Sequence, residues 1–199
     1  PSQMFTAIDS VPLTAIAFFM LTGELMTSAT ITDRLVALSR ALIGRIRGGL
    51  AQVNVLVSMF FAGMNGSVVA DTATVGALVL PAMKKAGYPA AFSAAVTGVS
   101  STIGGIIPPS IMMIVLANAT EISIASLFAA GIIPGILIGV VIMVTNHYFA
   151  VKYNFERSDE SFSIRRAGKE LYRSSFALLI PLVLVGSVMG GVASVVEAG

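Results

Sequence analysis

The chain of 199 residues is 56% hydrophobic and 11% charged, with a mean hydropathy of +0.91 and a formal net charge of +2. These values exclude an ordinary water-soluble domain and indicate an all-α integral membrane protein. The chain contains no cysteine, which excludes little. Because it begins at Pro1 and stops at Gly199 inside an apolar segment, we expect it to be an internal piece of a longer protein.

The basic residues fall in three blocks that predict the membrane topology. They lie within residues 34–47, at residues 84–85 and within residues 152–173. Under the positive-inside rule the three blocks are cytoplasmic, and the segments without basic residues, around 2–10 and 118–126, lie outside. We therefore expect a multi-pass protein whose Lys- and Arg-bearing segments face the cytoplasm.

Two elements come first in the chain. Residues 1–30 are predicted to form a scaffold transmembrane helix that crosses from outside to inside. Residues 31–48 are predicted to form an amphipathic arm helix at the cytoplasmic surface, because the apolar residues share one side and the arginines lie elsewhere.

Residues 49–84 have basic residues near both ends, so both ends are expected on the cytoplasmic side. Two helical arms in this segment would each be about 24 Å long, which is short of the ~30 Å hydrocarbon core. We therefore predict a re-entrant helical hairpin with its tip at Asn65, Gly66 and Ser67. Since non-helical backbone at this depth must be buried in protein or line a cavity, the tip should face a site. A single full crossing with a glycine kink is the alternative.

Residues 88–118 are predicted to form a transmembrane helix that is broken at Pro108 and Pro109. Both prolines lack a backbone N–H, so the carbonyl groups of Gly104 and Gly105 lose their helical donors. Neutral oxygen atoms of the kind that hard cations prefer would gather at this break. They belong to Ser100, Ser101, Thr102, Gly104, Gly105 and Ile107. A plain proline kink, with its carbonyl groups satisfied by neighbouring helices or Ser/Thr side chains, is the alternative.

The rest of the chain is predicted to continue the alternation of inward and outward membrane crossings. Residues 122–150 form a predicted transmembrane helix, and glycines spaced by four within 131–139 permit close helix packing. Residues 151–174 form a cytoplasmic surface segment with a second short surface helix. Residues 175–199 are the truncated start of the next transmembrane helix.

Discontinuous helices that meet near the membrane midplane are typical of secondary transporters. Asp71 lies one helical turn past the hairpin tip, and a carboxylate within the membrane is costly and functional by default. Three roles stay open for Asp71. It can ligate sodium directly or through a neighbouring group, couple transport through its own protonation, or bond backbone N–H groups at a helix start.

Three runs of sequence carry a resemblance to a known family: GRIRGGLAQVNVLVSMFFAGMNGSVVADTATVGALVLPAMKKAGY, STIGGIIPPSIMMIV and SIASLFAAGIIPGIL. Over nearly its whole length the chain resembles the large membrane (M) subunit of the tripartite ATP-independent periplasmic (TRAP) transporters. This resemblance implies a sodium-coupled symporter of the elevator type in the bacterial inner membrane. It also implies two inverted repeats, of which this chain holds the first.

The resemblance further implies an organic-anion substrate, either sialic acid or a C4-dicarboxylate. A periplasmic substrate-binding protein would deliver it, and a small membrane subunit, separate or fused, would complete the transporter. In the expected mechanism sodium neutralises the hairpin tip and an anionic substrate binds nearby. The hairpin and the broken helix then move as a unit against the flanking crossings.

Sodium (Na+) is the only ion that the resemblance implies, and we assign residues to it and to the substrate. The predicted sodium-binding residues are Asn65, Ser67, Asp71, Gly104, Ile107 and Pro109. The predicted substrate-binding residues are Gly66, Ser67, Ser100, Ser101, Thr102 and Ser110. The chain departs from the expected pattern twice, since its tip reads Asn-Gly-Ser rather than Ser-Gly-Ser and Gly105 stands where a proline is frequent.

Other classes of function find little support in the sequence. A membrane Ser/His protease needs a histidine near a membrane serine, whereas the sole His147 sits beside the cytoplasmic block. No Cys/His cluster suggests a metal centre, and the basic blocks match membrane topology rather than nucleic-acid binding. We expect no enzymatic activity. An ion channel with a pore-lining re-entrant loop is the alternative function.

Overall fold

A computed structural model of the chain describes residues 14, 16–18, 20–21, 31–43, 46–155 and 164–192. Every element in these ranges is a helix and no strand occurs among them, which confirms the all-α class. The crossing predicted for residues 1–30 lies almost wholly outside the described residues. Parts of the predicted segments 151–174 and 175–199 lie outside them as well.

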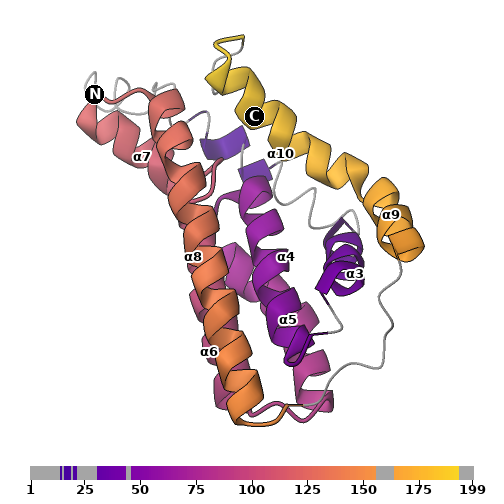
Figure 1. The fold of residues 1–199 in the computed structure, drawn as a ribbon. Coiled ribbons are helices and arrows are strands. Elements are labelled where there is room, and N and C mark those ends of the chain that lie inside the picture. Colours follow the sequence, from indigo (N-terminus) through magenta and orange to yellow (C-terminus); the bar gives the residue numbers. More distant parts are fainter. Residues whose placement is uncertain are drawn as a thin grey trace.

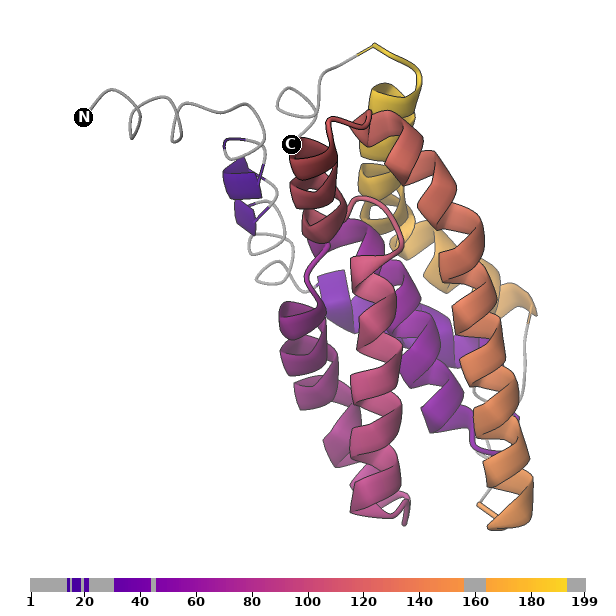
Figure 2. The same cartoon turned by 90° about the vertical axis from the view of Figure 1, so that its left-hand side faces the viewer.

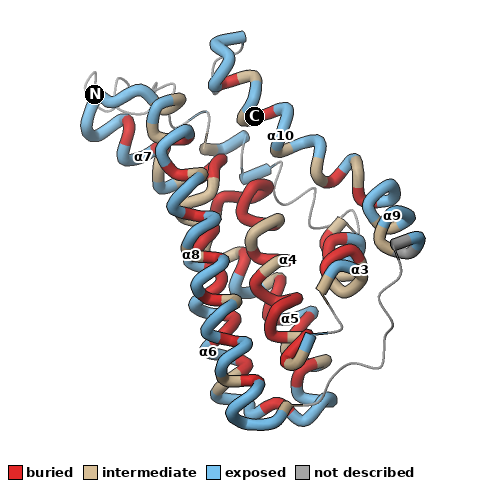
Figure 3. Tube along the Cα trace, in the orientation of Figure 1, coloured by how far each residue is buried: buried red, intermediate tan, exposed pale blue. Residues whose placement is uncertain are grey.

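Helix α4 (Gly49–Asn65) is the central element of the described fold (Figure 1). It packs against α3 (Ile31–Ile43), α5 (Val68–Lys85), α6 (Ala90–Ser101) and α8 (Ile124–Lys152). Its residues are predominantly apolar and most of them are buried, as Figure 3 shows. A helix that is apolar on all sides is stable when its neighbours cover it, so α4 forms the core of the bundle.

Helices α4 and α5 run back along each other and are joined through Gly66 and Ser67. Gly66 adopts a left-handed conformation with φ 58°, and its N–H donates to the carbonyl of Ala62 at 3.2 Å, which ends α4. The Ser67 hydroxyl accepts a hydrogen bond from the N–H of Ala70 at 3.4 Å, which begins α5. The chain reverses here because a left-handed glycine directly precedes a serine N-cap.

Both ends of this helix pair lie beside the C-terminal end of α8 (Figure 2). Gly48 precedes α4 and contacts Ala150, since a Cβ added to Gly48 would lie 2.5 Å from the Ala150 Cβ. Tyr88 follows α5 and packs on Phe155 with 4.7 Å between the ring centroids. The start of α4 and the end of α5 therefore both lie near the C-terminal end of α8.

The break predicted at Pro108 and Pro109 is confirmed. Helix α6 ends at Ser101 and is followed by a short 3₁₀ helix, η1 (Thr102–Gly105). The chain is then irregular until α7 (Ile111–Thr120) begins. A helix cannot continue through two residues that lack backbone N–H groups.

At Gly105 the structure agrees with the alternative of a kink whose carbonyl groups are satisfied by Ser/Thr side chains, because the carbonyl group of Gly105 is not left without a donor. The Ser110 hydroxyl donates to it at 2.9 Å. The same hydroxyl accepts a hydrogen bond from the N–H of Met113 at 3.4 Å and so forms the N-cap of α7. Ser110 thus supplies the donor that Pro109 lacks.

Helix α8 has 29 residues and is the one helix in the described ranges that is long and apolar enough to cross a membrane by itself. Helices α9 (Ile164–Arg173) and α10 (Ser175–Met189) meet the same criterion only together, as a pair bent by 58°. The outer face of α8 is largely exposed, as Figure 3 shows, and large side chains on it are apolar. They include Ile133, Leu137, Val141 and Val144. A contiguous apolar stripe of this kind suits contact with lipid or with another subunit.

Glycines on the inner face of α8 let this helix approach the break closely. A Cβ added to Gly131 would collide with the carbonyl oxygen of Ile106 and with the side chain of Met113. A Cβ added to Gly135 would collide with the side chain of Ile107. The break is therefore packed against α8 as well as against α4.

Substitution Gly131→Ala tests this packing. We expect it to lower the free energy of unfolding by about 1–3 kcal/mol, because the added methyl group meets a backbone carbonyl that cannot move aside. The measurement is thermal unfolding of the full-length transporter in detergent. Gly98→Ala on α6 is the matched control, since nothing lies within 4 Å of its added Cβ. Equal unfolding temperatures for the two variants would contradict the close approach.

Candidate functional site

The tip of the α4–α5 pair lies directly against the break between η1 and α7. The carbonyl group of Gly66 accepts a hydrogen bond from the N–H of Ile111 at 3.3 Å. A Cβ added to Gly66 would lie 2.5 Å from the carbonyl oxygen of Pro109 and 2.9 Å from the Cα of Ser110. Glycine is needed at this position both for its positive φ and for the close approach of the two backbones.

The start of α5 lies against η1 at the same junction. A Cβ added to Gly104 would lie 3.8 Å from the carbonyl oxygen of Ser67, and one added to Gly105 would lie 3.3 Å from a methyl group of Val68. On the other side of the turn, the Asn65 side-chain oxygen accepts a hydrogen bond from the N–H of Ser67 at 3.0 Å. The junction is thus lined mainly by backbone and by short polar side chains.

Asp71 lies in the first turn of α5 and is fully buried. The hydroxyl groups of Ser58 on α4 and Ser101 on α6 lie close enough to act on its carboxylate. Neither carboxylate oxygen is hydrogen bonded within the described part of the chain, and the Ser101 hydroxyl is likewise buried without a partner. Helices α5 and α6 therefore bring three unpartnered oxygen atoms together, and Ser58 of α4 lies beside them.

One of the three roles considered for Asp71 is wrong. A helix-start residue would bond backbone N–H groups, but its carboxylate bonds none, and Ser67 already caps α5. Burying a charge without a partner costs several kcal/mol, so a cation or a proton is needed beside this carboxylate. A set of oxygen atoms with free lone pairs fits a hard cation.

A buried polar network joins α4 to α6 next to Asp71. The amide nitrogen of Asn54 donates to the hydroxyl of Thr97 at 2.7 Å. The Ser100 hydroxyl lies 3.3 Å from the side-chain oxygen of Asn54, and the Ser58 hydroxyl lies 3.3 Å from that of Ser100. All four side chains are buried. A connected set of hydrogen bonds in a low-dielectric setting fixes the relative position of the two helices.

Asn54, Ser58 and Thr97 were absent from the residues predicted from sequence. A signal for them exists, because Asn54 and Ser58 are spaced by four and the other residues within 53–61 are apolar. Residues at this spacing share one helix face. A polar pair on the face of a buried helix indicates a polar partner on the neighbouring helix.

The structure brings most of the predicted site residues to one place. The residues at the junction of tip and break are Asn65, Gly66, Ser67, Gly104, Pro109 and Ser110. Asp71 and Ser101 lie next to each other on α5 and α6. Ile107 instead packs against Gly135 of α8.

Three residues predicted to bind substrate have hydroxyl groups that donate internal hydrogen bonds. The hydroxyl of Ser100 belongs to the buried network, and that of Ser110 caps α7 and holds the Gly105 carbonyl. Thr102 is exposed, and its hydroxyl donates to the carbonyl of Val99 at 2.7 Å. Of the predicted serines, Ser101 has a hydroxyl that is not hydrogen bonded within the described residues.

Comparison with known proteins assigns a family to this arrangement. All of residues 1–199 match the family model described as "Tripartite ATP-independent periplasmic transporter, DctM component". The chain is 36% identical, over 98% of its length, to the sialic acid TRAP transporter large permease protein SiaM of Vibrio cholerae, and covers 46% of that protein. The same three figures hold for the C4-dicarboxylate TRAP transporter large permease protein DctM of Pseudomonas aeruginosa.

A third relative is the 2,3-diketo-L-gulonate TRAP transporter large permease protein YiaN of Escherichia coli. It is 37% identical over 96% of the chain, which covers 45% of that protein. The chain therefore spans less than half the length of these relatives, all of which are permeases rather than enzymes. The resemblance seen in the sequence is confirmed, and the chain belongs to the DctM component family of the TRAP transporters.

Proposed function

We propose that this chain forms part of a sodium-coupled symporter that imports an organic anion across the bacterial inner membrane. The observation that carries the proposal is the fully buried carboxylate of Asp71, which lies beside the unpartnered hydroxyl of Ser101 where three helices meet. A site with one negative charge and free oxygen lone pairs suits a monovalent cation.

Sodium would be bound between the hairpin and the broken helix. Its ligands would come from the sodium-binding residues predicted from sequence, with Asp71 supplying the negative charge. We add Ser101 to that set, because its hydroxyl faces the carboxylate and has no other described partner. Sodium at this position cancels the carboxylate charge and favours the geometry in which tip and break are in contact.

An organic carboxylate would bind next to the neutralised tip. The three relatives carry the names of sialic acid, C4-dicarboxylates and 2,3-diketo-L-gulonate, which are all organic anions. In this chain the backbone of Gly66 and the polar groups of Ser67 and Ser101 would contribute to the substrate site. A periplasmic binding protein would deliver the substrate, and a small membrane subunit would complete the transporter.

The elevator mechanism is supported by the way α4 to α8 are joined. The network of Asn54, Ser58, Thr97 and Ser100 ties α4 to α6, and close contacts at glycines tie the break to α8. These helices would therefore move as one body against the flanking parts of the membrane domain. The arm helix α3 packs on α4 and would support this body from the side.

The position of the tip supports a re-entrant hairpin. The break, which contacts the tip, packs against α8 at Gly131, about 10 Å along the axis from the start of that helix. Both ends of the α4–α5 pair lie at the other end of α8. The tip would thus stop inside the membrane rather than cross it.

Substitution Asp71→Asn tests sodium coupling. We expect the initial rate of sodium-driven uptake to fall about tenfold to a hundredfold, because interactions with a charged group contribute about 1.5–3 kcal/mol. The measurement is uptake of labelled sialic acid and of a C4-dicarboxylate into liposomes that contain the full-length transporter. The binding protein is added outside, with or without a sodium gradient.

The matched control is Asp33→Asn, which removes an exposed carboxylate on α3. This variant should transport like the wild type. Flux that needs no sodium and survives Asp71→Asn would overturn the symporter and favour a channel.

Substitution Ser101→Ala tests the ligand set. It should raise the sodium concentration for half-maximal uptake about tenfold, since one hydroxyl ligand contributes roughly 1–1.5 kcal/mol. Ser93→Ala is the control on the same helix, because Ser93 is also buried but donates to the carbonyl of Pro89 near the helix start. Sodium titrations of uptake that are identical for the two variants would remove Ser101 from the site.

A further inference from the structure

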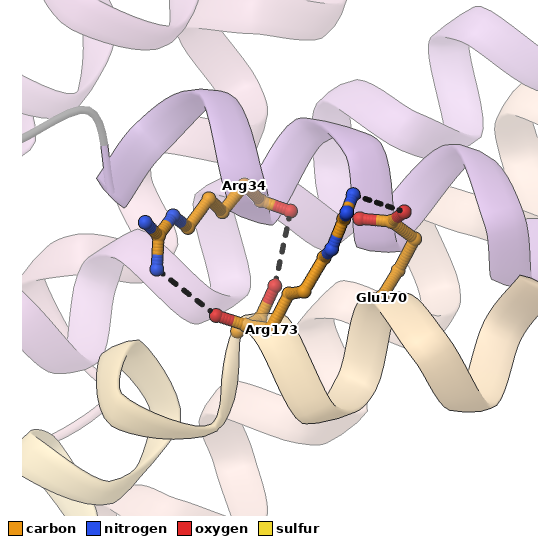
Figure 4. Close-up of polar contacts among 4 residues, drawn as sticks. Arg34, Glu170 and Arg173 are labelled. Atoms are coloured by element: carbon orange, nitrogen blue, oxygen red, sulfur yellow. Dashed lines mark hydrogen bonds and ion pairs between the residues drawn. The ribbon is translucent and has the colours of Figure 1, made fainter.

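Helix α9 is held against the arm helix α3 by hydrogen bonds at its C-terminal end (Figure 4). The Arg34 guanidinium donates through Nη1 to the carbonyl of Arg173 at 3.2 Å. In return, the hydroxyl of Ser174 donates to the carbonyl of Arg34 at 3.2 Å. Arg34 thereby satisfies a carbonyl of the last turn of α9, where a cation is also favoured by the helix dipole.

The side of α9 turned away from α3 is basic and aromatic. Arg165, Lys169 and Tyr172 are spaced by four and three residues, so they share one face, and all three are exposed. Neither basic side chain forms an ion pair with a described residue, whereas Glu170 is paired with Arg173 at 3.6 Å. This face therefore carries positive charge that no neighbouring described residue compensates.

The start of α10 places this basic face at a membrane boundary. Helix α10 is apolar, begins directly after Ser174 and leaves α9 at an angle of 58°. Tyr172 is 83% exposed and Phe176 is 78% exposed on either side of the bend. Exposed aromatic side chains at the end of an apolar helix are typical of the headgroup level of a bilayer.

A hollow on the other side of α9 is a weaker candidate for binding an anion. It has a volume of about 450 Å³ and is lined by Asp33, Arg34, Ala37, Glu170 and Arg173. Its basic and acidic residues are equal in number, and both arginines already bind protein groups. An anion would find no free positive charge there.

We propose that Arg165, Lys169, Tyr172 and Phe176 form a binding surface for an anionic phospholipid. The two basic side chains contact the phosphodiester group, and the two aromatic rings lie against the glycerol and upper acyl chains. Basic residues next to a transmembrane helix attract anionic lipid, with roughly a fivefold gain in binding for each charge near the surface. This surface is separate from the proposed sodium site and does not depend on it.

The experiment measures lipid preference by native mass spectrometry of the full-length transporter with its small subunit. The protein is released from mixed micelles that hold equal amounts of phosphatidylglycerol and phosphatidylcholine. Arg165→Gln with Lys169→Gln should reduce the preference for phosphatidylglycerol about thirtyfold. The matched control, Lys84→Gln with Lys85→Gln, removes the same charge from exposed positions at the end of α5 and should keep the wild-type preference.

Retention of the wild-type preference by the α9 variant would overturn the proposal. An equal loss in the α5 control would also overturn it, because the effect would then reflect net charge alone. Displacement of phosphatidylglycerol by excess inorganic phosphate would assign the surface to a soluble anion instead of a lipid. The charge-conserving double variant, Arg165→Lys with Lys169→Arg, should behave like the wild type.

Discussion

The close approach of two backbone interruptions is the constraint on which the rest of the site depends. The turn between α4 and α5 and the break between α6 and α7 each leave polar backbone groups outside a helix. In a membrane such groups must find partners within the protein. They do so by meeting, with the carbonyl of Gly66 bonded to the N–H of Ile111 and the carbonyl of Pro109 against Gly66 itself. A side chain on residue 66 would separate the two interruptions and expose both.

Around this contact, polar groups are either fully hydrogen bonded or left free. Asn54, Thr97 and Ser100 form a buried chain of bonds that specifies how α4 lies on α6. Asp71 and Ser101, on the next turns of the same bundle, are buried without partners. The satisfied groups hold the helices in register, and the unsatisfied ones are available to a ligand. Burying the Asp71 carboxylate without a hydrogen-bond partner costs free energy. The fold tolerates this cost because the surrounding packing holds the helix ends in place.

Much of this arrangement follows from local sequence. The break follows from the missing N–H groups of Pro108 and Pro109, and the turn follows from a glycine before a serine N-cap. The network around Asn54 does not, because it depends on which face of α4 meets α6. Sequence allows a Ser or Thr donor at the break but does not single out Ser110 as the donor to Gly105, since a side chain can replace a lost backbone N–H only once the turn has closed. Similarly, sequence marks serines as ligands but cannot tell which hydroxyls are already bonded.

The isolation of Asp71 also has an electrical consequence. Between Gly49 and Val151 the charged side chains are Asp71, Lys84, Lys85 and Glu121, and Asp71 alone lies next to the tip of the α4–α5 pair. Moving one elementary charge across a membrane potential of about 100 mV involves about 2.3 kcal/mol of work. In the proposed transporter, a monovalent cation on Asp71 leaves the interior of the moving body without net charge before the organic anion binds, and the potential hardly acts on that state. Once emptied, the body carries one negative charge, and an interior-negative potential pushes that charge outward. The membrane voltage would then drive the return of the empty carrier to its outward-facing state.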